Sequence, residues 1–146
     1  MFGCLAVHHR LLFIGSSEGC GRVLVVDSET GEEGHQFVFG AKESGKADAA
    51  GLAVDADSRV YVADTRNRAV RIFSVFGSEV GRLSALPSMS ARGSDRRGSL
   101  GRPHDLALDD DGRIYVCSGL ADRVHSVQCF LPDGTWVRSF HAGARV

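Results

Sequence analysis

Proline, tryptophan and methionine are scarce in this sequence, and no long apolar run is present. Of its 146 residues, 3 are proline, 2 are methionine and 1 is tryptophan. A helix that crosses a membrane needs about 20 consecutive apolar residues, whereas the apolar N-terminus is interrupted by His8, His9 and Arg10. That segment also lacks the basic start and clean apolar stretch of a signal peptide. We therefore expect it to form strands, and the compartment of the protein stays open.

The chain has no excess of charge of one sign and no closely spaced cysteines. Its 17 Lys and Arg residues nearly balance 18 Asp and Glu residues, which leaves a formal net charge of −1. Such a balance provides no general attraction to nucleic acid or to an acidic membrane surface. None of the four cysteines stands in a C-x-x-C pair, so a structural zinc cluster is not indicated. The disulfide state of Cys117 and Cys129 is left open, with buried thiols favoured.

Motifs of the common catalytic and nucleotide-binding sites are also missing. The sequence contains no G-x-S-x-G nucleophile elbow, no P-loop and no dinucleotide fingerprint. The acidic run Asp109–Asp111 lacks the spaced ligands and the closing Glu of a calcium-binding EF-hand loop. We interpret that run as a hairpin turn, because Asp and Gly favour tight turns between strands.

The sequence does contain three copies of one pattern of short apolar strands, at a spacing of roughly 50 residues. The clearest copy runs from Gly51 to Phe73, and looser copies lie at Asp105–Phe130 and Cys4–Val26. A weaker fourth strand is predicted after each copy, at residues 37–39, 79–83 and 136–140. No segment shows a sustained helical period. We therefore predict an all-β chain of three four-stranded antiparallel units.

The clearest copy resembles the NHL repeat, which forms one blade of a β-propeller. Gly51–Asp55 matches the opening of that repeat, Val60–Asp64 matches its second strand, and Asn67 matches its polar elbow. The last copy departs from the pattern at Cys117-Ser118, and the first copy keeps only the apolar positions. The resemblance implies that residues 1–146 form a single segment of a partial β-propeller. Its blades are expected at about residues 3–40, 50–84 and 103–141, with linkers at 41–49 and 85–102.

Three blades cannot close a ring, because propellers usually contain about 4–8 blades and each blade needs a neighbour on both faces. An isolated chain would expose two broad apolar faces. The chain is therefore expected to be either a part of a larger propeller or one half of a dimer that closes a six-bladed ring. At the elbow of the central blade, we interpret Asp64 and Asn67 as turn residues that satisfy backbone amides.

The resemblance implies binding of a protein, an RNA or a small ligand by loops at the propeller rim. We predict a non-catalytic interaction scaffold, with His104, Asp105, Arg96 and Arg97 as candidate binding residues. RNA binding by the arginine-containing linker is one alternative. It is disfavoured because no aromatic residues, on which bases could stack, stand among these arginines.

A metal-dependent enzyme is the other alternative. Pro103-His104-Asp105 is similar to the Pro-His openings of blades in peptidyl-α-hydroxyglycine α-amidating lyases, and that resemblance implies His104 as one metal ligand. A lactonase-like hydrolase belongs to the same alternative. Catalytic zinc needs about three protein ligands, but the matching positions of the other copies are Ala49-Ala50 and Phe2-Gly3. We therefore predict no cofactor, and zinc or calcium enters only under this alternative.

Overall fold

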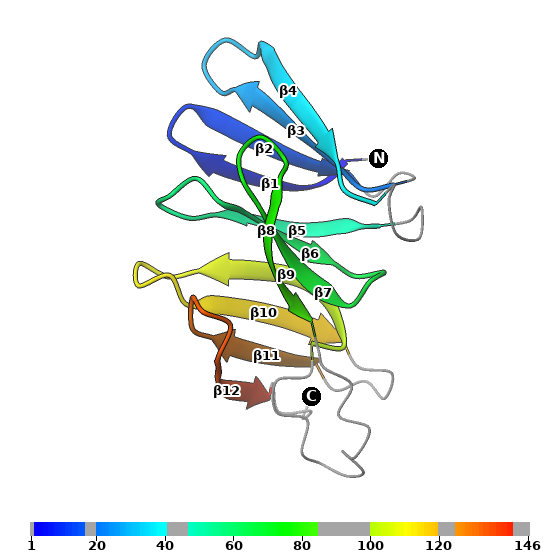
Figure 1. The fold of residues 1–146 in the computed structure, drawn as a ribbon, viewed down its shortest axis with the longest axis vertical. Helices are drawn as coiled ribbons and strands as arrows, with labels where there is room; N and C mark the ends of the chain where they lie inside the picture. Colours follow the sequence, from blue (N-terminus) through cyan, green and yellow to red (C-terminus); the bar gives the residue numbers. More distant parts are fainter. Residues whose placement is uncertain (1, 17–19, 41–46, 85–99, 120–124, 142–146) are drawn as a thin grey trace, which may run out of the picture.

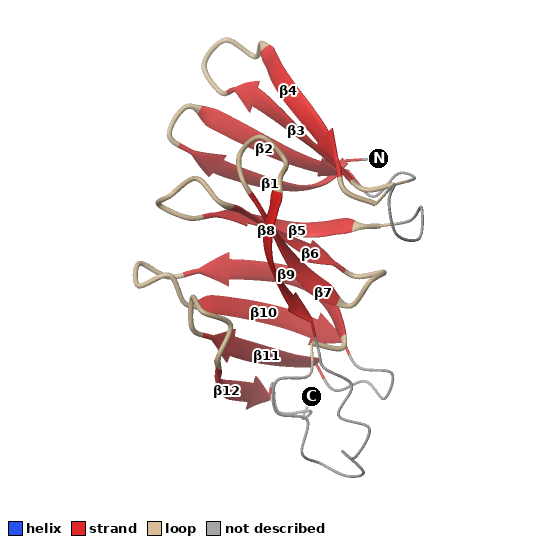
Figure 2. Ribbon diagram, viewed as in Figure 1, coloured by secondary structure: helices blue, strands red, loops and turns tan. Residues whose placement is uncertain are grey.

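The computed structural model of this chain consists of β-strands joined by turns. It describes residues 2–16, 20–40, 47–84, 100–119 and 125–141, and within these ranges it contains twelve strands and no helix (Figure 2). Those ranges accordingly hold no helix that could cross a membrane. The strands form three four-stranded sheets in which each strand pairs with the next one along the chain. The prediction of three four-stranded antiparallel units is confirmed.

The strands have the following bounds. The first sheet contains β1 (Phe2–His8), β2 (Leu11–Ser16), β3 (Arg22–Asp27) and β4 (Glu33–Val38). The second sheet contains β5 (Ala49–Val54), β6 (Val60–Asp64), β7 (Ala69–Phe73) and β8 (Glu79–Ser84). The third sheet contains β9 (Arg102–Leu108), β10 (Ile114–Gly119), β11 (His125–Phe130) and β12 (Trp136–His141).

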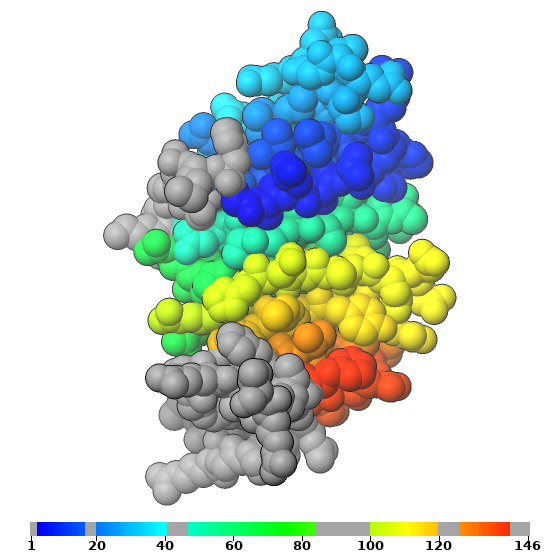
Figure 3. All heavy atoms as spheres, turned by 180° about the vertical axis from the view of Figure 1, so that it is seen from behind, coloured from blue at the N-terminus to red at the C-terminus, as the bar shows by residue number. Residues whose placement is uncertain are grey.

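The three sheets stack face to face in chain order (Figure 1). β1 packs against β5, and β5 packs against β9, so Figure 3 shows these first strands as successive dark blue, green-cyan and yellow bands. Gly51 permits the close approach of β5 and β9, because a Cβ atom there would lie 2.7 Å from the Cα atom of Asp105. Four-stranded sheets that adjoin through their first strands are typical of propeller blades. We call the three sheets blades 1, 2 and 3.

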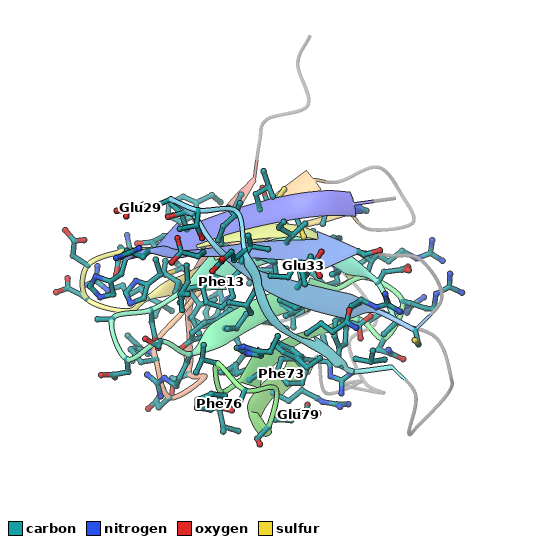
Figure 4. The ribbon with its side chains drawn as sticks, turned by 90° about the horizontal axis from the view of Figure 1, so that it is seen from above. Phe13, Glu29, Glu33, Phe73, Phe76 and Glu79 are labelled. Carbon is teal, nitrogen blue, oxygen red and sulfur yellow. The ribbon has the colours of Figure 1, made fainter. Side chains whose placement is uncertain are left out.

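Two apolar cores fill the spaces between the blades. The first core joins blade 1 to blade 2, and Figure 4 shows two of its residues, Phe13 and Phe73, inside the fold. The second core joins blade 2 to blade 3 through Tyr61 and Val70 on one side and Ile114 on the other. Every residue of β6 is buried, because this strand contributes to both cores. This explains why its sequence is a continuous apolar run rather than an alternating one.

The chain enters β5 and β9 on the side of the stack that also carries the β6–β7 turn, residues 65–68. The antiparallel register brings Ala49, Asp64 and Ala69 together on this side, which we call the linker face. The β1–β2, β5–β6 and β9–β10 turns lie on the opposite side (Figure 1), which we call the turn face.

The turn face repeats one arrangement in blades 2 and 3. Oδ1 of Asp55 accepts hydrogen bonds from the backbone N–H groups of Asp57 and Arg59, and Tyr61 donates its hydroxyl to Oδ2 at 3.1 Å. Asp109 makes the same three contacts with the residues at the equivalent positions of blade 3. Burial alone would raise the pKa of Asp55, but the hydrogen bonds from Arg59 and Tyr61 outweigh it and hold that pKa below its usual range. Asp55 and Asp109 therefore each stabilise a hairpin turn, as predicted for the run Asp109–Asp111.

The fourth strand of blade 1 differs from its predicted bounds. It begins at Glu33 rather than Phe37 and ends at Val38 rather than Phe39. The backbone of Glu33 and His35 pairs with β3 although these side chains are polar. A strand at the edge of a sheet needs no apolar pattern over its whole length, so the apolar residues alone predicted too short a segment.

One face of blade 1 is not covered by another blade. Leu5 and Val7 on this face are 65% and 67% exposed, whereas Leu52 and Leu106, at the positions equivalent to Leu5, are 6% and 7% exposed. In blades 2 and 3 the preceding blade covers this face. Blade 3 likewise has one face with no following blade, at the lower end of the stack in Figure 1.

Candidate functional site

His104 and Asp105 lie near the start of β9, and both are exposed. The imidazole of His104 lies over Gly119 of the neighbouring strand, where a Cβ atom would approach Nε2 to 2.9 Å. Asp105 accepts a hydrogen bond at Oδ1 from the backbone N–H of Leu106 at 2.9 Å. In the described part of the chain, no group of three or more His, Cys, Asp or Glu side chains could hold a metal ion. Residues 96 and 97, the two candidate arginines, lie outside the described residues.

Asp64 and Asn67 form the elbow between β6 and β7. Asp64 is fully buried, and its Oδ1 accepts hydrogen bonds from the backbone N–H groups of Asp48 and Asn67, each at 3.2 Å. Its Oδ2 accepts a third hydrogen bond, at 2.7 Å, from Nδ2 of Asn67. One carboxylate thus holds the β6–β7 turn against the segment that enters β5.

Arg71, which is buried, extends this elbow into an ionic network that was not predicted from the sequence. Its Nη1 atom lies 3.6 Å from Asp64 Oδ2 and donates to the carbonyl oxygen of Phe39 in blade 1 at 2.7 Å. Its Nη2 atom donates to Glu79 Oε2 at 2.7 Å. The guanidinium also lies over the rings of Phe39 and Phe73, at 5.2 and 5.3 Å. The sequence did contain a sign of this network. Arg71 stands inside an otherwise apolar strand, and Glu79 stands at the start of the next strand.

The charge of Glu79 is stabilised within this network. Burial alone would raise its pKa, but hydrogen bonds and ion pairs with Arg71 and Arg82 outweigh burial and hold the pKa below its usual range. The network links blade 2 to the carbonyl of blade 1. Its groups are all paired with one another, so we interpret it as structural.

A pocket of about 340 Å³ opens on the linker face. Its described lining residues are Asp48, Thr65, Arg66, Arg68 and Arg102. The hydroxyl of Thr65 donates to the carbonyl oxygen of Pro103, which fixes the β6–β7 turn beside the start of β9. Two segments that lie far apart in the sequence therefore present their arginines to one cavity.

The charges in this pocket are unevenly matched. Arg66 Nε lies 3.4 Å from Asp48 Oδ2, whereas Arg68 and Arg102 have no ion-pair partner among the described residues. Both of these side chains belong to exposed residues. From the sequence, Arg96 and Arg97 were chosen as candidates in the second linker, Arg102 was placed in that linker without a binding role, and Arg66 and Arg68 were overlooked. The proximity of Arg66, Arg68 and Arg102 depends on how blade 3 stacks on blade 2.

Two solved structures resemble the fold of this chain. "Structure of U3-55K" matches with a TM-score of 0.61 and 17% identity, over 94% of this chain and 36% of that one. "Crystal Structure of Mitotic Checkpoint Complex" matches with a TM-score of 0.62 and 16% identity, over 99% of this chain and 39% of that one. Both are WD40-like β-propeller proteins, so the chain has the fold of a partial β-propeller.

This chain spans well under half the length of either structural neighbour. No protein-family model and no curated protein matches the sequence. The similarity at this level of identity establishes the fold, and the function has to be argued from the residues of the linker face.

Proposed function

We propose that this chain is part of an NHL-like β-propeller that acts as a non-catalytic scaffold and binds a protein partner through its linker face. The pocket lined by Arg66, Arg68 and Arg102 is the observation that carries this proposal. It combines a rigid base, made by the ends of buried strands, with Arg68 and Arg102, which have no ion-pair partner among the described residues. Binding residues are frequently held on loops by such a scaffold.

The assignment to the NHL type is supported by the sequence pattern of blade 2. In the structure, Asp55 organises the first turn of this pattern and Asp64 organises the elbow. One structural neighbour was solved within a complex, the mitotic checkpoint complex. That is consistent with a propeller that contacts other proteins, and we propose the same class of partner here.

We further propose that another blade covers the open face of blade 1. The equivalents of Leu5 in blades 2 and 3 are covered by the apolar side chains of a preceding blade. Exposure of such an apolar face to water is unfavourable by roughly 25 cal/mol per Å². A solution mass of twice 15.6 kDa would indicate a second copy as the source of this blade. A monomeric mass would favour a further segment of a longer protein.

A peptide-display selection on the immobilised native chain tests the scaffold function. We expect enriched peptides whose binding slows hydrogen exchange at residues 48, 65–68 and 102 on the linker face. Failure to enrich any peptide, or protection confined to the turn face, would contradict the proposal.

An activity assay tests the enzymatic alternative in parallel. The native chain is loaded with Zn²⁺ and supplied with a peptidyl-α-hydroxyglycine or a lactone. Turnover that is lost in His104→Ala, together with stoichiometric zinc that this variant does not bind, would replace the scaffold proposal with a metal-dependent enzyme.

A further inference from the structure

We propose that the arginine pocket, formed by Arg66, Arg68 and Arg102, binds an anionic side chain on a peptide segment of the partner. The anionic group is a carboxylate or a phosphate ester, since both offer oxygen pairs that match the fork of a guanidinium. This inference rests on the proposed function, because it takes the partner to be a protein. It adds the chemistry by which that partner is recognised.

The three arginines come from two segments that lie far apart in the sequence. Arg66 and Arg68 extend from the β6–β7 turn, and Arg102 extends from the start of β9 in the next blade. The hydrogen bond from Thr65 to the carbonyl oxygen of Pro103 holds these two segments together. The three arginines therefore line one cavity because blades 2 and 3 stack, and not because of their order in the sequence.

The described lining of the pocket carries an excess of positive charge. Like charges in one cavity repel one another, so three arginines beside a single carboxylate favour an added anion. Asp48 compensates Arg66 only in part, with side chains that are 24% and 49% exposed. The described lining therefore holds three positive groups against one negative group, an excess of two.

The backbone of Arg68 has a conformation that is unusual for a residue with a side chain. Its φ angle is 52°, in the left-handed region that favours glycine or asparagine. A non-glycine residue there costs of the order of 1 kcal/mol. Glycine would fit the turn at lower cost, so we infer that the side chain of Arg68 has a role outside the fold.

The size and lining of the pocket favour a peptide over a nucleic acid. A volume of about 340 Å³ is at the lower end of ligand pockets and suits one or two side chains. No aromatic side chain is among its described lining residues, whereas single-stranded nucleic acids are usually held by stacking on aromatic rings. The net charge of −1 also provides no general attraction to a polyanion.

The test uses the native full chain and four labelled probes in a fluorescence-anisotropy titration at low salt. The probes are a tetraglutamate peptide, a peptide of equal length with one phosphoserine, a neutral tetraglutamine peptide and an oligouridylate. We expect one of the two anionic peptides to bind, with an affinity that falls as salt is raised. The tighter of the two identifies the source of the anionic group.

Two variants, Arg68→Gly and Arg102→Gln, each remove a proposed contact. A third variant, Arg10→Gln, is the matched control. Arg68→Gly removes a guanidinium and relieves the left-handed backbone, so we expect affinity to fall about tenfold while the melting temperature is unchanged or higher. Arg102→Gln should weaken binding by a similar factor from the other segment. Arg10→Gln removes one positive charge from the turn face, where its side chain is 61% exposed. It should change the affinity by less than about twofold.

The inference is overturned if neither anionic peptide binds, if the tetraglutamine peptide binds equally well, or if Arg68→Gly leaves the affinity unchanged. Tighter binding of the oligouridylate than of either peptide would assign the pocket to nucleic acid instead. The failure of the two proposals is distinguishable. Non-acidic peptides that protect the linker face in the display experiment would leave the scaffold function standing and remove only the anionic chemistry.

Discussion

Blades 2 and 3 place different chemistry at the same position of the same backbone. In blade 2, the buried residues Asp64 and Arg71 form an ionic network with Glu79, whose side chain is partly exposed. The equivalent residues of blade 3, by strand register, are Ser118, Gln128 and Trp136. Here the side chains at these three positions are uncharged, and Trp136 Nε1 donates to Gln128 Oε1 at 2.6 Å.

The difference shows that the blade fold does not need an ionic network at this position. Burying two charges costs several kcal/mol of desolvation, which their attraction offsets only when the geometry is good. The blade 2 network also contacts Asp48 N before β5 and the carbonyl oxygen of Phe39 in blade 1. We therefore infer that the main role of this network is to position the linker face and the arginine pocket, and that its net contribution to stability is secondary.

The largest expected effect comes from Asp64→Ala. It leaves Arg71 buried without a carboxylate partner on one side and removes three hydrogen bonds from the elbow. We expect the free energy of unfolding to fall by about 3–5 kcal/mol, measured by chemical denaturation. Asp57→Ala is the control, because its carboxylate is 82% exposed. A loss no larger than that of the control would show that the network is dispensable.

The next effect concerns Glu79, which titrates, whereas Trp136 at the equivalent position does not. Because the folded pKa of Glu79 lies below its usual value, its stabilisation is present near neutral pH and is lost as the pH falls through that pKa. The Glu79 side chain is 30% exposed, so solvent screens part of its attraction to the arginines. With that reduction, we expect Glu79→Gln to be less stable than the native chain by about 1.5–2 kcal/mol at pH 7. The difference in stability between the native chain and Glu79→Gln should narrow between about pH 5 and pH 3. A difference that does not change with pH would contradict the stabilising role of the Glu79 charge.

A smaller effect distinguishes the two turns that share the aspartate arrangement. Tyr61 is 2% exposed and lies between blades 2 and 3, whereas Tyr115 lies on the uncovered face of blade 3. Tyr61→Phe removes the hydroxyl that donates to Asp55 and should lower the free energy of unfolding by about 1.5 kcal/mol. We expect a smaller loss for Tyr115→Phe in the same denaturation experiment. Equal losses would mean that burial between blades does not strengthen this hydrogen bond.

The smallest effect is expected at Ser118, and its sign is opposite to that of Asp64→Ala. The hydroxyls of Ser118 and Ser126 are buried and have no hydrogen-bond partner in the described part of the chain. Ser118→Ala removes one of these groups and should leave stability unchanged or raise it by up to about 1 kcal/mol. A loss of stability of more than about 1 kcal/mol would contradict this expectation, because it would indicate that the Ser118 hydroxyl makes a hydrogen bond.

The strand pattern predicts most of the fold, because buried strands and Asp-Gly turns are determined by neighbouring residues. The elbow at Asp64 and Asn67 was also recognisable from local sequence. The arginine pocket was not, since Arg68 and Arg102 become neighbours only when two blades stack. The start of β4 was also missed, because the backbone of Glu33 pairs with β3 although the sequence there has no apolar pattern.

Hydrogen exchange with and without the tetraglutamate and phosphoserine peptides tests the central claim most directly, because it compares the two faces of one molecule. The account predicts slower exchange at residues 48, 65–68 and 102 with the peptide that binds, and no change at the turns of residues 55–59 and 109–113. Protection at these turns with none on the linker face would contradict it.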